Sequence, residues 1–140
     1  MAAPAFGFSV GDFVAVTSLI VSVVQAIRGT SDDLIELKEL QDELNHLQSL
    51  FEQVKSGISS SSAISEQNVE RLRQTFSRCH KILSDFKPFI EKYASSPTGL
   101  AKYRRRVEWS LRKKQQVEHF RRRLQSYVST LSMIQGELNR

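Results

Sequence analysis

The stretch LKELQDELNHLQSLFEQVK, residues 37–55, carries an apolar residue at alternating steps of three and four positions. That spacing returns side chains to one side of an α-helix, whereas a strand would scatter them over both of its faces. The resulting seam follows a heptad repeat. Its members are Leu37, Leu40, Leu44, Leu47, Phe51 and Val54. The stretch therefore predicts an amphipathic helix that needs partner helices to cover its seam.

Two further segments repeat this spacing, one after Ser65 and one at the C-terminal end of the chain. The first stripe consists of Val69, Leu72, Phe76, Cys79, Leu83, Phe86 and Ile90. The second consists of Val117, Phe120, Leu124, Tyr127, Leu131, Ile134 and Leu138. Together with an N-terminal segment, they predict an all-α fold, an antiparallel bundle of four main helices with one helix split or kinked.

Interruptions in the patterns predict where these helices end. The second helix should open at Ser31 and give way to a small, polar surface loop at residues 56–65. Pro88 lies inside the third stripe, so a kink or a break is expected there. The segment SSPTG, residues 95–99, predicts a turn. An apolar row that is out of register with the last seam predicts a bend around residues 109–114.

The N-terminal stretch GFSVGDFVAVTSLIVSVVQAIRG, residues 7–29, has no charge between Asp12 and Arg28. A secretory signal would need a basic region before its apolar core, and the stretch has none. A membrane span needs about 20 consecutive apolar residues, whereas the run 13–27 is shorter and is diluted by polar side chains. We therefore expect a helix at residues 10–28 that belongs to a soluble bundle and is apolar around much of its circumference.

The chain of 140 residues, 40% hydrophobic and 25% charged, is enough for one globular domain. Cys79 is its single cysteine, which excludes a disulfide framework within the chain and fits a reducing, intracellular setting. The last seam is still in phase at Arg140. We therefore expect residues 1–140 to form one helical domain from the N-terminal part of a longer chain.

The sequence contains no recognisable catalytic pattern. His46, His80 and His119 flank the apolar stripes without a ligand at metal-binding spacing, so we expect them on the surface. Cys79 occupies a stripe position, which favours a small buried hydrophobe over a nucleophile. Neither a glycine-rich phosphate loop nor a nucleophile elbow occurs. The sequence predicts a protein that is not an enzyme and that holds no cofactor or metal.

The net charge of +5 is unevenly distributed along the chain. Residues 102–123 contain ten of the twenty Lys and Arg residues against two acids, and residues 31–52 contain seven acids against one Lys. An acidic helix and a basic helix therefore share a small domain. This predicts neutralisation within the bundle or pairing between copies.

The basic residues have two interpretations. A solvated helix face that pairs with the acidic helix would explain them fully. Alternatively they bind an anionic membrane, since each Lys or Arg near an anionic leaflet contributes about 1 kcal/mol. The candidates are Arg104, Arg105, Arg106, Arg112, Lys113, Lys114, Arg121, Arg122 and Arg123. Nucleic acid ranks lower as a partner, because no helix-turn-helix or base-stacking pattern accompanies the charges.

Three landmarks together resemble a known family. They are GFSVGDFVAVTSLIVSVVQAIRG, LKELQDELNHLQSLFEQVK and WSLRKKQQVEHFRRRLQSYVSTLSMI. The chain resembles, over nearly its whole length, the N-terminal helical domain of fungal STAND, NLR-like and related proteins, the HeLo-like group. The resemblance implies an intracellular protein in which the bundle precedes a C-terminal nucleotide-binding, repeat or ubiquitin-like sensor domain.

Relatives in the wider HeLo group act in regulated cell death, where oligomerisation releases an apolar N-terminal segment into a membrane. The resemblance implies a signalling or effector domain of a fungal innate-immunity or incompatibility protein. Such a domain self-associates on activation and relocates from the cytoplasm to the plasma membrane. The implied membrane-insertion candidates are Phe6, Phe8, Phe13, Val16, Leu19, Ile20, Val23, Val24 and Ile27. The alternative is a non-lytic protein–protein interaction or oligomerisation module attached to a nucleotide-binding or ubiquitin-like domain.

Overall fold

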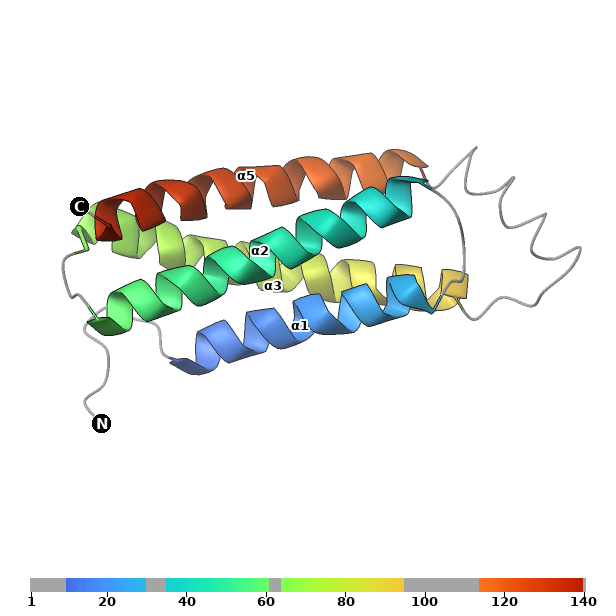
Figure 1. The fold of residues 1–140 in the computed structure, drawn as a ribbon. Helices are drawn as coiled ribbons and strands as arrows, with labels where there is room; N and C mark the ends of the chain where they lie inside the picture. The colour runs from blue at the N-terminus through green and yellow to red at the C-terminus, as the bar shows by residue number, and fades with distance from the viewer. Residues whose placement is uncertain (1–9, 30–34, 61–63, 95–113, 140) are drawn as a thin grey trace, which may run out of the picture.

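A computed structural model of the chain describes residues 10–29, 35–60, 64–94 and 114–139. These residues form four helices that run alternately in opposite directions, as an antiparallel bundle (Figure 1). The helices are α1 (Val10–Arg28), α2 (Ile35–Ser60), α3 (Glu66–Ala94) and α5 (Lys114–Leu138). The predicted fold class is confirmed.

The order of the helices around the bundle differs from their order along the chain. α1 packs against α2 and α3, and α5 packs against the same two helices. The consecutive helices α2 and α3 therefore lie diagonally opposite each other. Two neighbouring pairs, α1 with α3 and α2 with α5, run parallel (Figure 1). Sequence periodicity could not predict this arrangement, because it shows which side of a helix is apolar and not which helix covers it.

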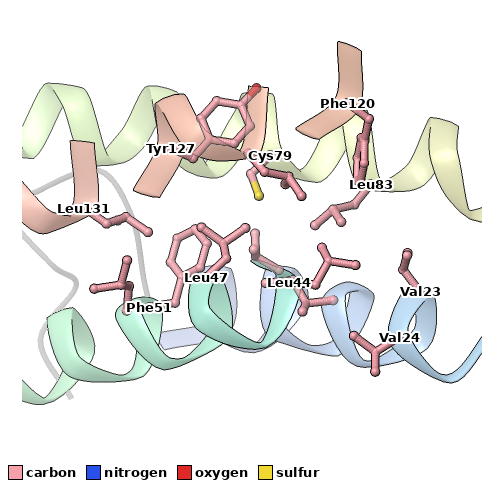
Figure 2. Close-up of a cluster of buried hydrophobic side chains, with 14 of the residues drawn as sticks. Val23, Val24, Leu44, Leu47, Phe51, Cys79, Leu83, Phe120, Tyr127 and Leu131 are labelled. Atoms are coloured by element: carbon pink, nitrogen blue, oxygen red, sulfur yellow. The ribbon is translucent and has the colours of Figure 1, made fainter. Parts of the chain in front are cut away.

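The apolar stripes read from the sequence form the core. With the exception of Val69, which is partly buried, the predicted seam residues of α2, α3 and α5 are buried. Figure 2 shows part of this core, where Leu44, Leu47 and Phe51 of α2 point toward Cys79 and Leu83 of α3. All four helices therefore contribute to one continuous hydrophobic core.

Phenylalanine rings connect the helices at two levels of the bundle. Phe76 of α3 meets Phe13 of α1 edge to face, with ring centroids 4.7 Å apart, and stacks at 5.6 Å on Phe51 of α2. Farther along, Phe86 of α3 stacks on Phe120 of α5 at 4.0 Å. Such pairs contribute about 0.5–1.5 kcal/mol each beyond the area they bury. Phe76 thus connects α3, on which it lies, to both α1 and α2.

The start of α3 is held by its own cap and by the end of α5. Ser65 Oγ accepts a 3.2 Å hydrogen bond from the backbone N–H of Asn68, as an N-cap residue does. The Glu137 carboxylate accepts hydrogen bonds from the Ser65 backbone N–H, at 2.5 Å, and from the Asn68 side-chain amide. Asn68 is a buried polar residue that the sequence pattern did not single out, and this network satisfies its side chain.

The structure differs from the sequence at two predicted interruptions, the loop at 56–65 and a break at Pro88. The expected loop at 56–65 begins later, because α2 continues to Ser60. Gly57 lies against Leu138, whose Cδ1 would be 3.0 Å from an added Cβ, and Ile58 packs on the core, so contact with α5 extends the helix. Pro88 does not break α3.

The missing proline N–H leaves the carbonyl of Ser84 without its helical partner. Because Ser84 and Pro88 both lie on the exposed side of α3, water can satisfy that carbonyl. The expected turn at 95–99 lies outside the described residues, as does most of the expected bend at 109–114. α5 begins at Lys114.

Candidate functional site

α1 holds most of the membrane-insertion candidates in the core. The buried ones are Phe13, Val16, Ile20, Val23, Val24 and Ile27. Leu19 is partly buried and packs against the same core. Phe6 and Phe8 lie outside the described residues. Lipid could reach the buried candidates only if α1 left the bundle.

The side of α1 that faces away from the core forms an outer strip. This strip consists of Val14, Ser18, Val21 and Gln25, all exposed. Val14 and Val21 are 50% and 37% exposed although both are apolar. Asp12 and Arg28 are the charged residues of α1 and lie near its two ends. The strip is therefore an uncharged surface with two exposed valines on a helix whose other side is core.

By length and composition, α1 could cross a membrane over the 18 residues Gly11–Arg28. This corrects the expectation from the sequence that the segment is too short, because the helix extends beyond the apolar run at both ends. The core helix of a soluble protein passes the same test, and 33% of this window is buried inside the bundle. The composition of α1 is thus compatible both with a membrane-spanning helix and with the core helix of a bundle.

Arg121, one of the anionic-lipid candidates, is directed at α2. Its Nη2 atom lies 2.9 Å from Glu39 Oε2 and 2.5 Å from Glu43 Oε1, and its side chain is 22% exposed. The hydrogen bond to Glu43 raises the pKa of the guanidinium. Lys114 makes a longer, 3.6 Å ion pair with Glu36. Within the described residues, the acidic α2 and the basic α5 thus neutralise each other inside one bundle.

The three consecutive arginines of α5 do not share a face. Successive helical residues are turned by about 100°, so Arg121 reaches α2, Arg123 lies toward α3, and Arg122 is exposed between them. The remaining anionic-lipid candidates Arg104, Arg105, Arg106, Arg112 and Lys113 lie outside the described residues. In the described part of the chain, Arg122 is the arginine of this triplet that lies in neither a carboxylate pair nor a groove.

The three histidines and the cysteine are placed as the sequence predicts. His46, His80 and His119 are exposed. Cys79 is buried, and burial raises the pKa of its thiol to about 12, which leaves little thiolate at neutral pH. Among the residues that the structure describes, no group of three or more His, Cys, Asp or Glu side chains could hold a metal ion.

A groove between α3 and α5, with a volume of about 460 Å³, was missed from the sequence. This α3–α5 groove is lined chiefly by Arg78, Ile82, Phe86, Phe89, Phe120 and Arg123. Ile82 and Phe89 lie beside the buried stripe of α3 and are partly buried. Two apolar residues outside the stripe could have indicated from the sequence that α3 has a second apolar surface.

Residues 4–139 match the family model described as the N-terminal domain of the pigment biosynthesis cluster protein PigL. The chain belongs to this family. The PigL N-terminal family is one of HeLo-like helical domains, in agreement with the resemblance found in the sequence and with the four-helix bundle. No curated protein and no solved structure gives a significant match to the chain.

Proposed function

We propose that this HeLo-like domain is an effector of regulated cell death that self-associates and inserts α1 into a membrane. One observation carries the proposal: α1 is uncharged between Asp12 and Arg28, is long enough to cross a membrane, and exposes apolar side chains on its outer strip. Exposed Val14 and Val21 would extend the apolar surface that α1 presents to lipid over its outer strip.

The energetics require a trigger for this insertion. The six buried candidates of α1 contribute roughly 1.5–3 kcal/mol each by leaving water. Together this is about as large as the whole stability of a typical domain, about 5–15 kcal/mol. Release of α1 into water is therefore negligible. Release into hydrocarbon returns the same side chains to an apolar environment, so lipid offsets most of the cost.

Self-association of several copies on activation would supply the trigger by holding several α1 helices at one membrane. In this proposal the domain belongs to a fungal innate-immunity or incompatibility protein and is governed by a C-terminal sensor domain of the same chain. It resides in the cytoplasm and relocates to the plasma membrane on activation. It has no enzymatic role, and nucleic acid is not its partner.

The outer strip allows a test that spares the core. Val21→Glu places a charge where the membrane would be, on a side chain that is already exposed, so the bundle should fold as before. We expect it to abolish dye release from anionic vesicles. Ile35→Glu is the matched control, because Ile35 is 65% exposed on α2. Dye release that is unchanged in the Val21→Glu chain, or lost equally in both variants, contradicts insertion of α1.

A second candidate function is a non-lytic interaction module. The burial of six insertion candidates and the internal pairing of Arg121 favour it, since both features are those of a stable resting bundle. Light scattering and vesicle co-sedimentation separate the two functions. Oligomers that form without lipid and never bind vesicles support the interaction module, whereas vesicle binding that the Val21→Glu change abolishes supports insertion.

A further inference from the structure

The α3–α5 groove combines an apolar floor with a cationic end. Phe86 and Phe120 stack face to face with an interplanar angle of 2°, and Ile82 and Phe89 extend the apolar surface along α3. From Arg78 to Phe89, the helical rise of 1.5 Å per residue gives the groove a length of about 16 Å. Its volume of about 460 Å³ lies within the usual range of small-molecule sites, about 300–1,000 Å³.

The positive charge is concentrated at one end of the groove. Burial raises the pKa of Tyr127, and Arg123 and Arg78 both lie near enough to its hydroxyl to oppose that rise. Because α3 and α5 run antiparallel, Arg78, the first groove residue of α3, and Arg123, the last groove residue of α5, lie toward the same end of the groove. The stacked rings of Phe86 and Phe120 lie toward the opposite end.

The two arginines are available to a ligand. Among the described residues neither Arg78 nor Arg123 pairs with a carboxylate. Arg123 Nε donates a 3.2 Å hydrogen bond to His119 Nε2, and the Arg123 side chain also hydrogen-bonds Tyr127. Lys81, also on the rim, is 3.2 Å from Asp85, so these two charges neutralise each other. The uncompensated charge in the groove is therefore that of the two arginines.

We infer that the α3–α5 groove binds a free fatty acid, with its carboxylate between Arg78 and Arg123 and its alkyl chain along Ile82, Phe86 and Phe120. Guanidinium groups pair with carboxylates through parallel, charge-assisted hydrogen bonds. The charge at one end and the apolar floor beyond it match an amphiphile with one anionic head. An acidic helix fits less well, because it would carry charge along its whole length.

A single alkyl chain matches the dimensions of the groove. The groove is about 16 Å long and has a volume of about 460 Å³, which is room for one alkyl chain and its carboxylate. The inference does not rest on the proposed membrane function, because a monomeric fatty acid needs no bilayer to bind.

Calorimetric titration of the 140-residue chain with dodecanoate, below its micelle concentration, tests the inference. Dodecanoate should bind, and 1-dodecanol should bind at least about tenfold more weakly, since hydrogen bonds to a charged group contribute about 1.5–3 kcal/mol. Octanoate should bind roughly 200-fold more weakly than dodecanoate, because it lacks four CH₂ groups and each buried CH₂ contributes about 0.8 kcal/mol. Equal affinity for dodecanoate and dodecanol would overturn the inference.

Variants locate the site. Arg78→Gln and Arg123→Gln should each lower the affinity for dodecanoate about 10- to 100-fold. Arg122→Gln, which changes the exposed neighbour of Arg123, should leave it unchanged within twofold. Thermal unfolding by circular dichroism shows whether each variant is folded. An equal loss of affinity in Arg122→Gln and Arg123→Gln would overturn the assignment to the groove.

Two further probes identify the ligand class. Binding to anionic vesicles without binding to dodecanoate would overturn the groove site and leave the membrane proposal standing. Dodecyl phosphate that binds more than tenfold tighter than dodecanoate would overturn the choice of a carboxylate.

Discussion

Replacement of Phe76 by leucine should weaken the hold of the bundle on α1 without changing α1 itself. Phe76 meets Phe13 of α1 at a centroid distance of 4.7 Å and Phe51 of α2 at 5.6 Å. The substitution removes both ring pairs but keeps a branched apolar side chain in the core. The substitution therefore weakens the contact between α1 and the bundle while the sequence of α1, and with it the affinity of α1 for lipid, stays the same.

The expected loss follows from these two contacts. At about 0.5–1.5 kcal/mol for each aromatic pair, Phe76→Leu should lower the free energy of unfolding by roughly 1–3 kcal/mol. A domain of ordinary stability, about 5–15 kcal/mol, remains folded after such a loss. If α1 leaves the bundle during membrane insertion, only the Phe13–Phe76 pair is broken, because Phe51 and Phe76 lie on α2 and α3. The loss of about 0.5–1.5 kcal/mol from that pair should raise the released fraction by about 2- to 13-fold, and the initial rate of vesicle leakage should rise with it.

Urea unfolding followed by circular dichroism measures the first quantity, and dye release from anionic vesicles measures the second. Phe120→Leu is the control, since Phe120 pairs with Phe86 between α3 and α5. We expect this control to lower the free energy of unfolding by about 0.5–1.5 kcal/mol. It should raise leakage much less than Phe76→Leu does, because the Phe120–Phe86 pair does not hold α1.

Two results would refute this reasoning. If Phe76→Leu destabilises the bundle and leakage does not increase, release of α1 is not the step that limits insertion. If both variants raise leakage in proportion to their loss of stability, general unfolding exposes the lipid-binding surface, and no specific detachment of α1 is involved.

Three other predictions concern stability in urea. Arg121→Gln should lower the free energy of unfolding by about 1–3 kcal/mol, because Glu43, 23% exposed, loses its charged partner. The control Arg122→Gln should change it by no more than about 0.5 kcal/mol. Equal effects of the two substitutions would show that the ion pair contributes nothing. Because burial raises the pKa of Cys79 from 9.0 to about 12, the unfolded chain loses the thiol proton first as pH rises. Stability is full below pH 9 and should fall between pH 9 and 12 by up to about 1.4 kcal/mol per pH unit, with a smaller slope in Cys79→Ala; an unchanged slope would contradict the assignment. Gly136→Ala should stabilise α5 by about 0.5–1 kcal/mol, since the added Cβ meets no atom within 4 Å; a loss of stability would show that the site is not open.

Much of the fold was predictable because its determinants are local. The bounds of α1 and the start of α3 follow from the spacing of apolar side chains and from capping at Ser65. Burial of the seams of α2 and α5 follows from the heptad spacing alone. Helical periodicity can be recognised in a short segment of sequence, so it predicts a helix without knowledge of the rest of the chain.

The errors arose where distant contacts override local preference. The serine-rich end of α2 has the composition of a loop, yet Gly57 lies against Leu138 and the helix continues. Pro88 has the local character of a helix breaker, yet it lies on the exposed side of α3, and the helix is uninterrupted. In both cases the burial of neighbouring apolar side chains stabilises the helix more than the unfavourable local residues destabilise it.

The candidate sites divide in the same way. The sequence by itself determined that α1 is apolar and uncharged between Asp12 and Arg28 and that α2 and α5 have opposite charge, because composition and periodicity are properties of the chain itself. Only the tertiary structure decided that six insertion candidates are core, that Arg121 neutralises Glu43, and that Arg78 and Arg123 line one groove. The physical reason is that periodicity specifies the direction of a side chain on its own helix, whereas its partner depends on which helix packs beside it.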